Sequence, residues 1–145
     1  MGDTMMEMNK DCVYCNDDGS RGKLMIEICK LEVSTVYLFR EQTYMGRCNV
    51  VFDGHRKELF DLSEEELSAY MKDVSRVAQA ITKAFSPDKL NYGAFGDTMP
   101  HLHMHVVPKY KDKENWGSTF VMNPAQVYLS DEEYSVMIDK IKANL

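Results

Sequence analysis

Three of the four histidines in this 145-residue chain stand at alternating positions in one short segment, HLHMHVVP at residues 101–108. Side chains alternate between the two faces of a β-strand, so His101, His103 and His105 are predicted to share one face. The apolar residues between and after them are predicted to face the core: Leu102, Met104 and Val106. Because imidazole has an ordinary pKa of about 6.5, such a face can supply a nucleophile, a proton donor or a metal ligand near neutral pH.

The residues alone leave three interpretations of this strand open. A solvent-exposed face that merely carries histidine would require a coincidence involving three of the four histidines. A metal site is the second interpretation, since neutral imidazoles two residues apart can converge on zinc or iron. Phosphoryl chemistry is the third, since a neutral ring can attack phosphorus while a neighbouring ring supplies charge or a proton to the leaving group.

Composition limits the classes of partner. The 17 lysines and arginines against 23 acidic residues give a net charge of −6, which argues against a nucleic-acid or anionic-membrane surface. A phosphate ligand would then need a local positive pocket. No apolar run approaches the roughly 20 residues of a membrane helix, and the start MGDTMMEMNKD lacks the order of a signal peptide. We therefore predict a cytoplasmic protein without nucleic-acid or membrane partners.

The cysteines fall into two groups. Cys12 and Cys15 form a Cys-x-x-Cys pair, which in a reducing compartment predicts a metal clip or a redox pair before a structural disulfide. Cys29 and Cys48 stand alone in apolar stretches and are predicted to be packed.

The remaining pattern predicts one α+β domain at residues 12–145, preceded by a mobile, polar arm at residues 1–11. A turn-rich segment covers residues 16–22, and a capping box of Ser63 with Glu66 begins a long helix that Pro87 ends. A second capping box begins the last helix at Ser130. With these two helices we predict a mostly antiparallel sheet of about five strands, the last ending at Pro108. The strands are expected within residues 23–32, 34–41, 46–53, 89–97 and 101–108.

HLHMHVV resembles the His-φ-His-φ-His-φ-φ signature of the histidine triad family of nucleotide hydrolases and transferases, where φ is an apolar residue. CVYC, GRCNVVFDGHRKELFDLSEEEL and NYGAFGDTMPHLHMHVVPKY resemble further family segments in the same order, so the resemblance spans residues 12–110. It implies a histidine triad fold, a homodimer, and a small-molecule nucleotide substrate such as a dinucleoside polyphosphate or a nucleoside phosphoramidate.

The resemblance also implies roles for single residues. His103 would attack the α-phosphorus to give a nucleotidyl-histidine, held by the backbone carbonyl of His101 at its other ring nitrogen. His105 looks like the family's phosphate-contacting histidine. Asn91 resembles an asparagine that contacts the nucleotide or phosphate; the alternative is a turn-forming residue beside Gly93.

In family members with a Cys-x-x-Cys pair, a histidine before the long helix and the first triad histidine look like the remaining ligands of one zinc. Carried over, the ligands are Cys12, Cys15, His55 and His101. Such a closed site would be structural, because no position is left for a substrate water. The alternative is a pair of free thiols with His55 as a surface or capping residue.

The chain departs from the family pattern at several positions. Arg47 stands where members often carry histidine, and is expected either to contact phosphate or to cover the surface. Asp97 stands where glutamine is common, so it either points away or marks a different substrate. Glu41 is a shifted candidate for contacting the ribose. Trp116 is expected simply to pack, and the alternative is a place on a loop near the site.

Two rival functions follow. A non-catalytic, zinc-stabilised nucleotide-binding module would result if Asp97 and Arg47 have removed catalysis. A metal-dependent hydrolase would use all three triad rings as ligands. A transferase acting on sugar phosphates is disfavoured, because Leu102 stands where that branch usually has proline.

Overall fold

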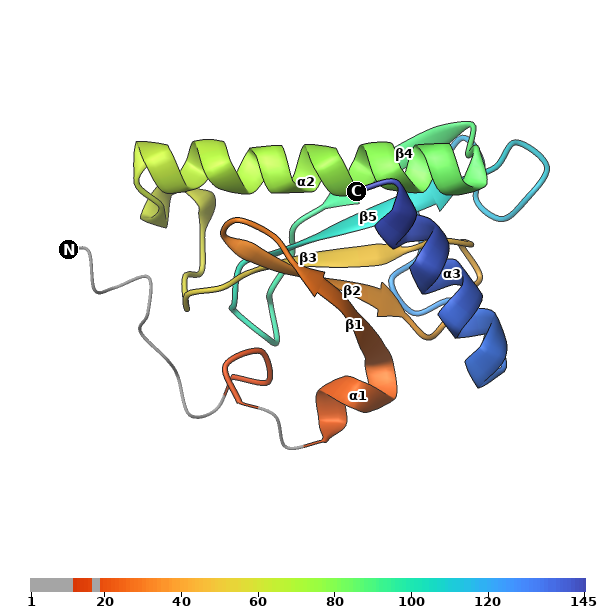
Figure 1. Ribbon diagram of the computed structural model, residues 1–145, viewed down its shortest axis with the longest axis horizontal. Coiled ribbons are helices and arrows are strands. Elements are labelled where there is room, and N and C mark those ends of the chain that lie inside the picture. The colour runs from red at the N-terminus through yellow and green to blue at the C-terminus, as the bar shows by residue number, and fades with distance from the viewer. Residues whose placement is uncertain (1–11, 17–18) are drawn as a thin grey trace.

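The computed structural model describes residues 12–16 and 19–145, so the arm predicted at residues 1–11 lies outside the described residues. Figure 1 shows the arrangement of the elements along the chain. In order they are α1 (Ser20–Leu24), β1 (Met25–Lys30), β2 (Ser34–Phe39), β3 (Cys48–Phe52), the 3-10 helix η2 (Leu59–Asp61), α2 (Glu64–Phe85), β4 (Lys89–Gly93), β5 (His103–Lys109) and α3 (Asp131–Ala143).

The strands form one five-stranded antiparallel sheet in the order β1-β2-β3-β5-β4, which confirms the predicted α+β class. The two long helices are also where the capping boxes predicted them. The short helix α1 was not predicted, because its sequence SRGKL follows a run of turn-forming residues and makes only five residues of helix.

The triad strand differs from the prediction at both ends. β5 begins at His103, so His101 and Leu102 lie in the connection that precedes it. It runs to Lys109, and Pro108 therefore lies inside the strand, where it pairs with Leu90 of β4. Proline is tolerated there because β3 pairs with β5 only as far as Val106, which leaves one side of β5 without a neighbouring strand.

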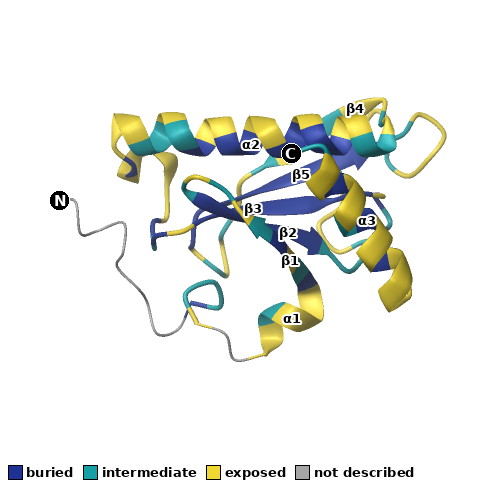
Figure 2. Cartoon of the chain, viewed as in Figure 1, coloured by how far each residue is buried: buried dark blue, intermediate teal, exposed yellow. Residues whose placement is uncertain are grey.

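Helices α2 and α3 cover one face of the sheet. Figure 1 shows α2 running along the strands, and Figure 2 shows that its buried side faces the sheet while its outer side is exposed. The core beneath it includes the side chains predicted to alternate with the histidines: Leu102, Met104 and Val106. The triad rings consequently lie on the opposite face, which these helices leave open. No helix within residues 12–16 and 19–145 has an apolar stretch long enough to cross a membrane.

Asp73 of α2 fixes this helix to the turn between β1 and β2. Its carboxylate is 1% exposed and accepts hydrogen bonds from the Val33 amide at 3.0 Å and the Ser34 hydroxyl at 2.7 Å. A buried carboxylate needs hydrogen-bond donors, and the buried amide and hydroxyl need an acceptor, so each group satisfies the other.

Replacing Asp73 with alanine is therefore expected to lower the free energy of unfolding by about 2–3 kcal/mol, since buried donors would lose a charged acceptor. Urea unfolding followed by circular dichroism measures the change. Asp139→Ala, an exposed position on α3, is the matched control and should leave the midpoint almost unchanged. Equal midpoints for the two variants would contradict a structural role for Asp73.

Candidate active site and metal centre

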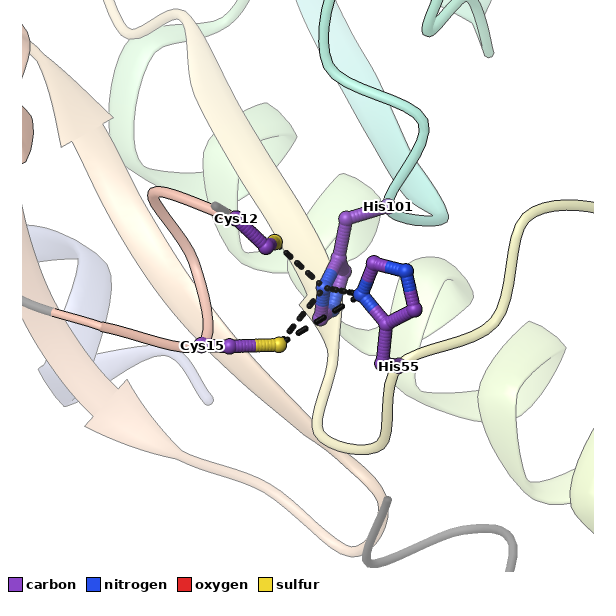
Figure 3. Close-up of side chains that lie close together, drawn as sticks. All are labelled: Cys12, Cys15, His55 and His101. Carbon is purple, nitrogen blue, oxygen red and sulfur yellow. Dashed lines mark hydrogen bonds between the residues drawn. The ribbon is translucent and has the colours of Figure 1, made fainter. Parts of the chain in front are cut away.

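Four residues from distant parts of the chain meet in one cluster, and one of them is the first histidine of the triad (Figure 3). They are Cys12 and Cys15 in the first described segment, His55 in the loop after β3, and His101 just before β5, and their ligand atoms all lie within 4.8 Å of one another. Cys12 and His101 are 89 positions apart in the sequence. This is the set of residues that the resemblance implied.

The distances within this cluster suit a metal ion. The Nδ1 atom of His101 lies 3.2 Å from the Cys12 sulfur, 3.6 Å from the Cys15 sulfur and 3.3 Å from the Nδ1 atom of His55. The Cys15 sulfur lies 3.4 Å from that same His55 atom. Metal bonds of about 2.0–2.3 Å in a tetrahedron place neighbouring ligands about 3.3–3.8 Å apart. The group therefore has the donor atoms and the spacing to hold one metal ion.

The protonation state of His101 also suits metal binding. Its Nε2 atom donates to the Phe52 carbonyl at 2.7 Å, so Nδ1 carries no proton and faces the two sulfurs. Burial lowers the pKa of His101 to about 4, which keeps the ring neutral and able to bind a metal.

His103 is the first residue of β5 and is 7% exposed. Its Nδ1 atom lies 2.6 Å from the His101 backbone carbonyl. A carbonyl only accepts hydrogen bonds, so the ring proton is on Nδ1 and Nε2 has a free lone pair. Burial lowers the pKa of His103, so the ring stays neutral at neutral pH. The ring thus has the protonation state of a nucleophile.

An open cleft of about 1200 Å³ lies over this face of the sheet, and both His103 and His105 line it. Asn91 and Asp97 also line the cleft, whereas Arg47 and the metal-site residues are not among the described residues that do so. A volume of this order is typical of small-molecule sites. The cleft therefore gives a small molecule access to His103 and His105.

The ring of His105 is enclosed by aromatic side chains. It stacks on Phe39 with 5.2 Å between ring centres and an interplanar angle of 16°, and meets Phe95 edge-on at 5.9 Å. Burial is the main cause that lowers its pKa to about 3, and the nearby charge of Arg47 adds to it. His105 is therefore a neutral ring at neutral pH.

Asn91 is part of strand β4, where it pairs with Val107 of β5. The alternative of a turn-forming residue is wrong for this reason. Its side-chain oxygen accepts a hydrogen bond from the Lys109 ammonium group at 3.2 Å, which orients the amide at the edge of the cleft.

The tertiary contacts of Arg47, Glu41 and Trp116 differ from those expected from the sequence. Arg47 does not cover the surface, because it is 2% exposed and lies behind His105. Glu41 is not among the described residues that line the cleft; its carboxylate instead accepts hydrogen bonds from Thr43 and Val127. Trp116 is 43% exposed, so the prediction that it packs is wrong.

Tyr14 is a residue of the site that the sequence did not single out. Its ring centre lies 5.4 Å from that of His101 and 5.2 Å from that of His103, and it lines the cleft. The Asn49 amide donates to its hydroxyl at 2.9 Å, and burial raises the pKa of Tyr14 to about 12. Its position between Cys12 and Cys15 was the available signal, because a metal clip there must bring the intervening residues to the site.

Comparison with known proteins agrees with the fold. Residues 27–112 match the HIT domain family model. A histidine triad (HIT) protein from Sinorhizobium meliloti superposes with a TM-score of 0.82 at 23% identity, covering 90% of this chain and 96% of that one. A zinc-bound histidine triad family protein from Mycobacterium smegmatis gives a TM-score of 0.63 at 21% identity, covering 92% and 94%.

Two curated relatives come from Schizosaccharomyces pombe. An adenosine 5'-monophosphoramidase is 22% identical over 138 residues, which are 88% of this chain and 98% of that protein. A bis(5'-nucleosyl)-tetraphosphatase is 38% identical over 58 residues, which are 37% of this chain and 32% of that protein. With more than half of its length matched by the family model, the chain belongs to the HIT domain family of nucleotide-binding hydrolases and transferases.

Proposed function

We propose that the protein is a nucleotide hydrolase or nucleotidyl transferase that cleaves phosphorus-linked nucleotides through a nucleotidyl-histidine on His103. The observation that carries this proposal is the hydrogen bond between Nδ1 of His103 and the His101 carbonyl, which leaves the lone pair of Nε2 available beside the cleft. Dinucleoside polyphosphates and nucleoside phosphoramidates are the substrate classes, since the names of the two yeast relatives describe enzymes for such compounds.

The reaction has two steps in this proposal. First, Nε2 of His103 forms a bond to the α-phosphorus, and the bond from phosphorus to the leaving group breaks. A water molecule then attacks the same phosphorus, the bond from phosphorus to Nε2 breaks, and the proton of the water passes to solvent, which releases the nucleotide and restores the neutral ring. His105 and Asn91 line the cleft and are proposed to contact the phosphate oxygens.

We further propose that Cys12, Cys15, His55 and His101 hold one structural zinc ion. Two thiolates and two imidazoles complete a tetrahedron, so the ion would supply rigidity rather than a reactive water. His101 would then be fixed at its side chain by the metal and at its backbone carbonyl by His103. The rival metal-dependent hydrolase is disfavoured, because among the described residues the clustered metal ligands include neither His103 nor His105.

The proposal is tested by trapping the intermediate. Mixing enzyme with a slow substrate, quenching in base and measuring the intact mass should reveal a chain that is heavier by one nucleotidyl group, and peptide mapping should place that group on His103. Turnover without any adduct would contradict covalent catalysis on this residue. Binding of nucleotide with neither adduct nor turnover would favour the non-catalytic module instead.

The carboxylate of Asp97 is expected to weaken nucleotide binding, because it is exposed and lines the cleft. Replacing it with asparagine removes a like charge near the phosphates, worth about 0.5–1 kcal/mol in a largely solvated site. We expect Kd for a nucleotide to fall roughly twofold to fivefold.

Isothermal titration calorimetry measures this binding. Asp139→Asn on α3, outside the cleft, carries the same change in net charge and should leave Kd unchanged. Equal effects of the two variants would mean that Asp97 does not act locally.

The resemblance also implies a homodimer, which stays a prediction. Size-exclusion chromatography with light scattering should give twice the chain mass of 16.7 kDa. A mass equal to one chain at micromolar concentration would contradict it.

A further inference from the structure

We propose that Arg47 is a positioning residue that fixes the tautomer of His105, so that His105 always presents an N–H group to the substrate. The inference rests on the proposed function, since it gives His105 a defined part in the transfer reaction. It starts from a position where this chain carries arginine and family members often carry histidine.

Arg47 is held in place by the turn that precedes it. Gly46 adopts φ of +95°, and a Cβ atom there would lie 2.7 Å from the ring of Phe85. Both conditions require glycine. The turn directs Arg47 inward, where its guanidinium donates to the Met122 carbonyl at 3.1 Å.

Two aromatic rings pack against the guanidinium. Its central carbon lies 4.5 Å from the ring centre of Phe39 and 5.3 Å from that of Phe120. Phe39 also stacks on His105, so the arginine and the histidine share one aromatic neighbour. Cation–π contacts of this kind stabilise a guanidinium away from water. Arg47 therefore has a defined position relative to the His105 ring.

The contact between the two side chains decides where the histidine proton is. The Nη2 atom of Arg47 lies 3.3 Å from the Nδ1 atom of His105. A guanidinium has donors and no acceptor, and it stays charged here because burial lowers the pKa of Arg47 only to about 10. The Nδ1 atom of His105 must accept, so its single proton is on Nε2.

His103 has the opposite tautomer for an equally local reason. Its Nδ1 atom donates to the His101 carbonyl, which leaves Nε2 without a proton. The two rings are neighbours, with 5.1 Å between their centres. One ring thus offers a lone pair and the other an N–H group, and each assignment depends on a single partner at Nδ1.

The proton count limits what His105 does in the reaction. A neutral ring has one N–H, and giving that proton away would leave an imidazolate, so His105 donates a hydrogen bond and keeps the proton. A phosphate leaving group departs as a stable anion and needs no proton, whereas an amine leaving group must take one up from solvent. The geometry therefore favours nucleoside polyphosphates over phosphoramidates as substrates.

The charge of Arg47 supports the same substrate class. Among the described residues no carboxylate lies within ion-pair distance of its guanidinium. A buried positive charge without a counterion is costly, and a phosphate bound next to His105 would provide one. Arg47 thus places a positive charge behind His105 in a chain whose net charge is −6.

Nuclear magnetic resonance of protein labelled with ¹⁵N-histidine tests the inference without any substrate. Long-range ¹H–¹⁵N spectra should show the His105 proton on Nε2 alone and the His103 proton on Nδ1 alone. In Arg47→Met, which keeps the apolar packing and removes the donor, the shifts of the two His105 nitrogens should move toward each other. Arg47→Lys, which keeps a charged donor, should restore the wild-type pattern at least in part.

Activity provides the second measurement. Arg47→Met should lower kcat for a dinucleoside polyphosphate roughly 10- to 100-fold, as expected when a donor to developing charge is weakened, with a smaller change in KM. Thermal unfolding of each variant checks the fold, and wild-type spectra remain decisive if the Met variant does not fold.

A wild-type His105 with its proton on Nδ1 would overturn the inference, as would Arg47→Met spectra identical to wild type. A higher kcat/KM of the wild-type enzyme for phosphoramidates than for polyphosphates would overturn the substrate assignment. Correct tautomers without any nucleotidyl-histidine would instead count against the proposed function alone.

Discussion

Replacing His103 with alanine is expected to reduce turnover of a dinucleoside polyphosphate by roughly 10³-fold or more, because the proposed nucleophile is removed and its neighbours have no equivalent lone pair. Nδ1 of His101 faces the two sulfurs, and Nδ1 of His105 faces Arg47. Neither ring replaces the Nε2 atom of His103 at the cleft. Steady-state assays of product release measure the loss.

Two controls separate chemistry from structure in this variant. Nucleotide binding, measured by isothermal titration calorimetry, should stay within about threefold of wild type, since ground-state binding and the chemical step depend on different interactions. The metal content should also be unchanged, because His103 is not among the clustered ligands. Turnover close to wild type would rule out His103 as the nucleophile, and loss of the metal would favour the metal-dependent rival.

Removing the metal is expected to produce the second large effect. A ligand present at about 1,000 times its Kd stabilises the folded chain by about 4 kcal/mol. Each kcal/mol shifts Tm by roughly 2–4 °C in a domain of this size. We therefore expect a strong chelator to lower Tm by about 10 °C, and to reduce activity, since Tyr14 and the His101 carbonyl both contact His103.

Elemental analysis and calorimetry check this prediction. The purified protein should contain one zinc per chain, and Cys15→Ser should contain much less. Cys29→Ser is the matched control, because Cys29 packs against the core away from the cluster. A metal-free protein with unchanged Tm and activity, or a Cys15→Ser variant that retains zinc, would contradict a structural role for the metal.

Much of the fold was already decided by local sequence patterns. The apolar periodicity and the Ser63–Glu66 and Ser130–Glu133 capping boxes predicted both long helices, because helix caps depend on residues only three positions apart. Strand alternation likewise predicted that His103 and His105 share a face. These inferences need no knowledge of distant residues.

The four-residue metal cluster was implied by the family resemblance, and the residue types and spacing alone did not predict it. The motif order suggested which cysteines and histidines belong together, but proximity between Cys12 and His101 is a property of the folded chain alone. The homodimer and the cytoplasmic location, which depend on the same resemblance and on composition, stay predictions.

The sequence alone determined that three histidines alternate along one short segment and that two capped helices accompany an antiparallel sheet. The tertiary structure decided that only His103 and His105 lie on the strand, and which nitrogen of each ring carries the proton. Arg47 was read as a surface or phosphate-contacting residue, and Tyr14 was not noticed at all. Their roles depend on partners far away in sequence, such as Met122 for Arg47 and Asn49 for Tyr14. Burial and hydrogen-bond direction arise only when such segments pack together, and these two quantities set the protonation of a histidine.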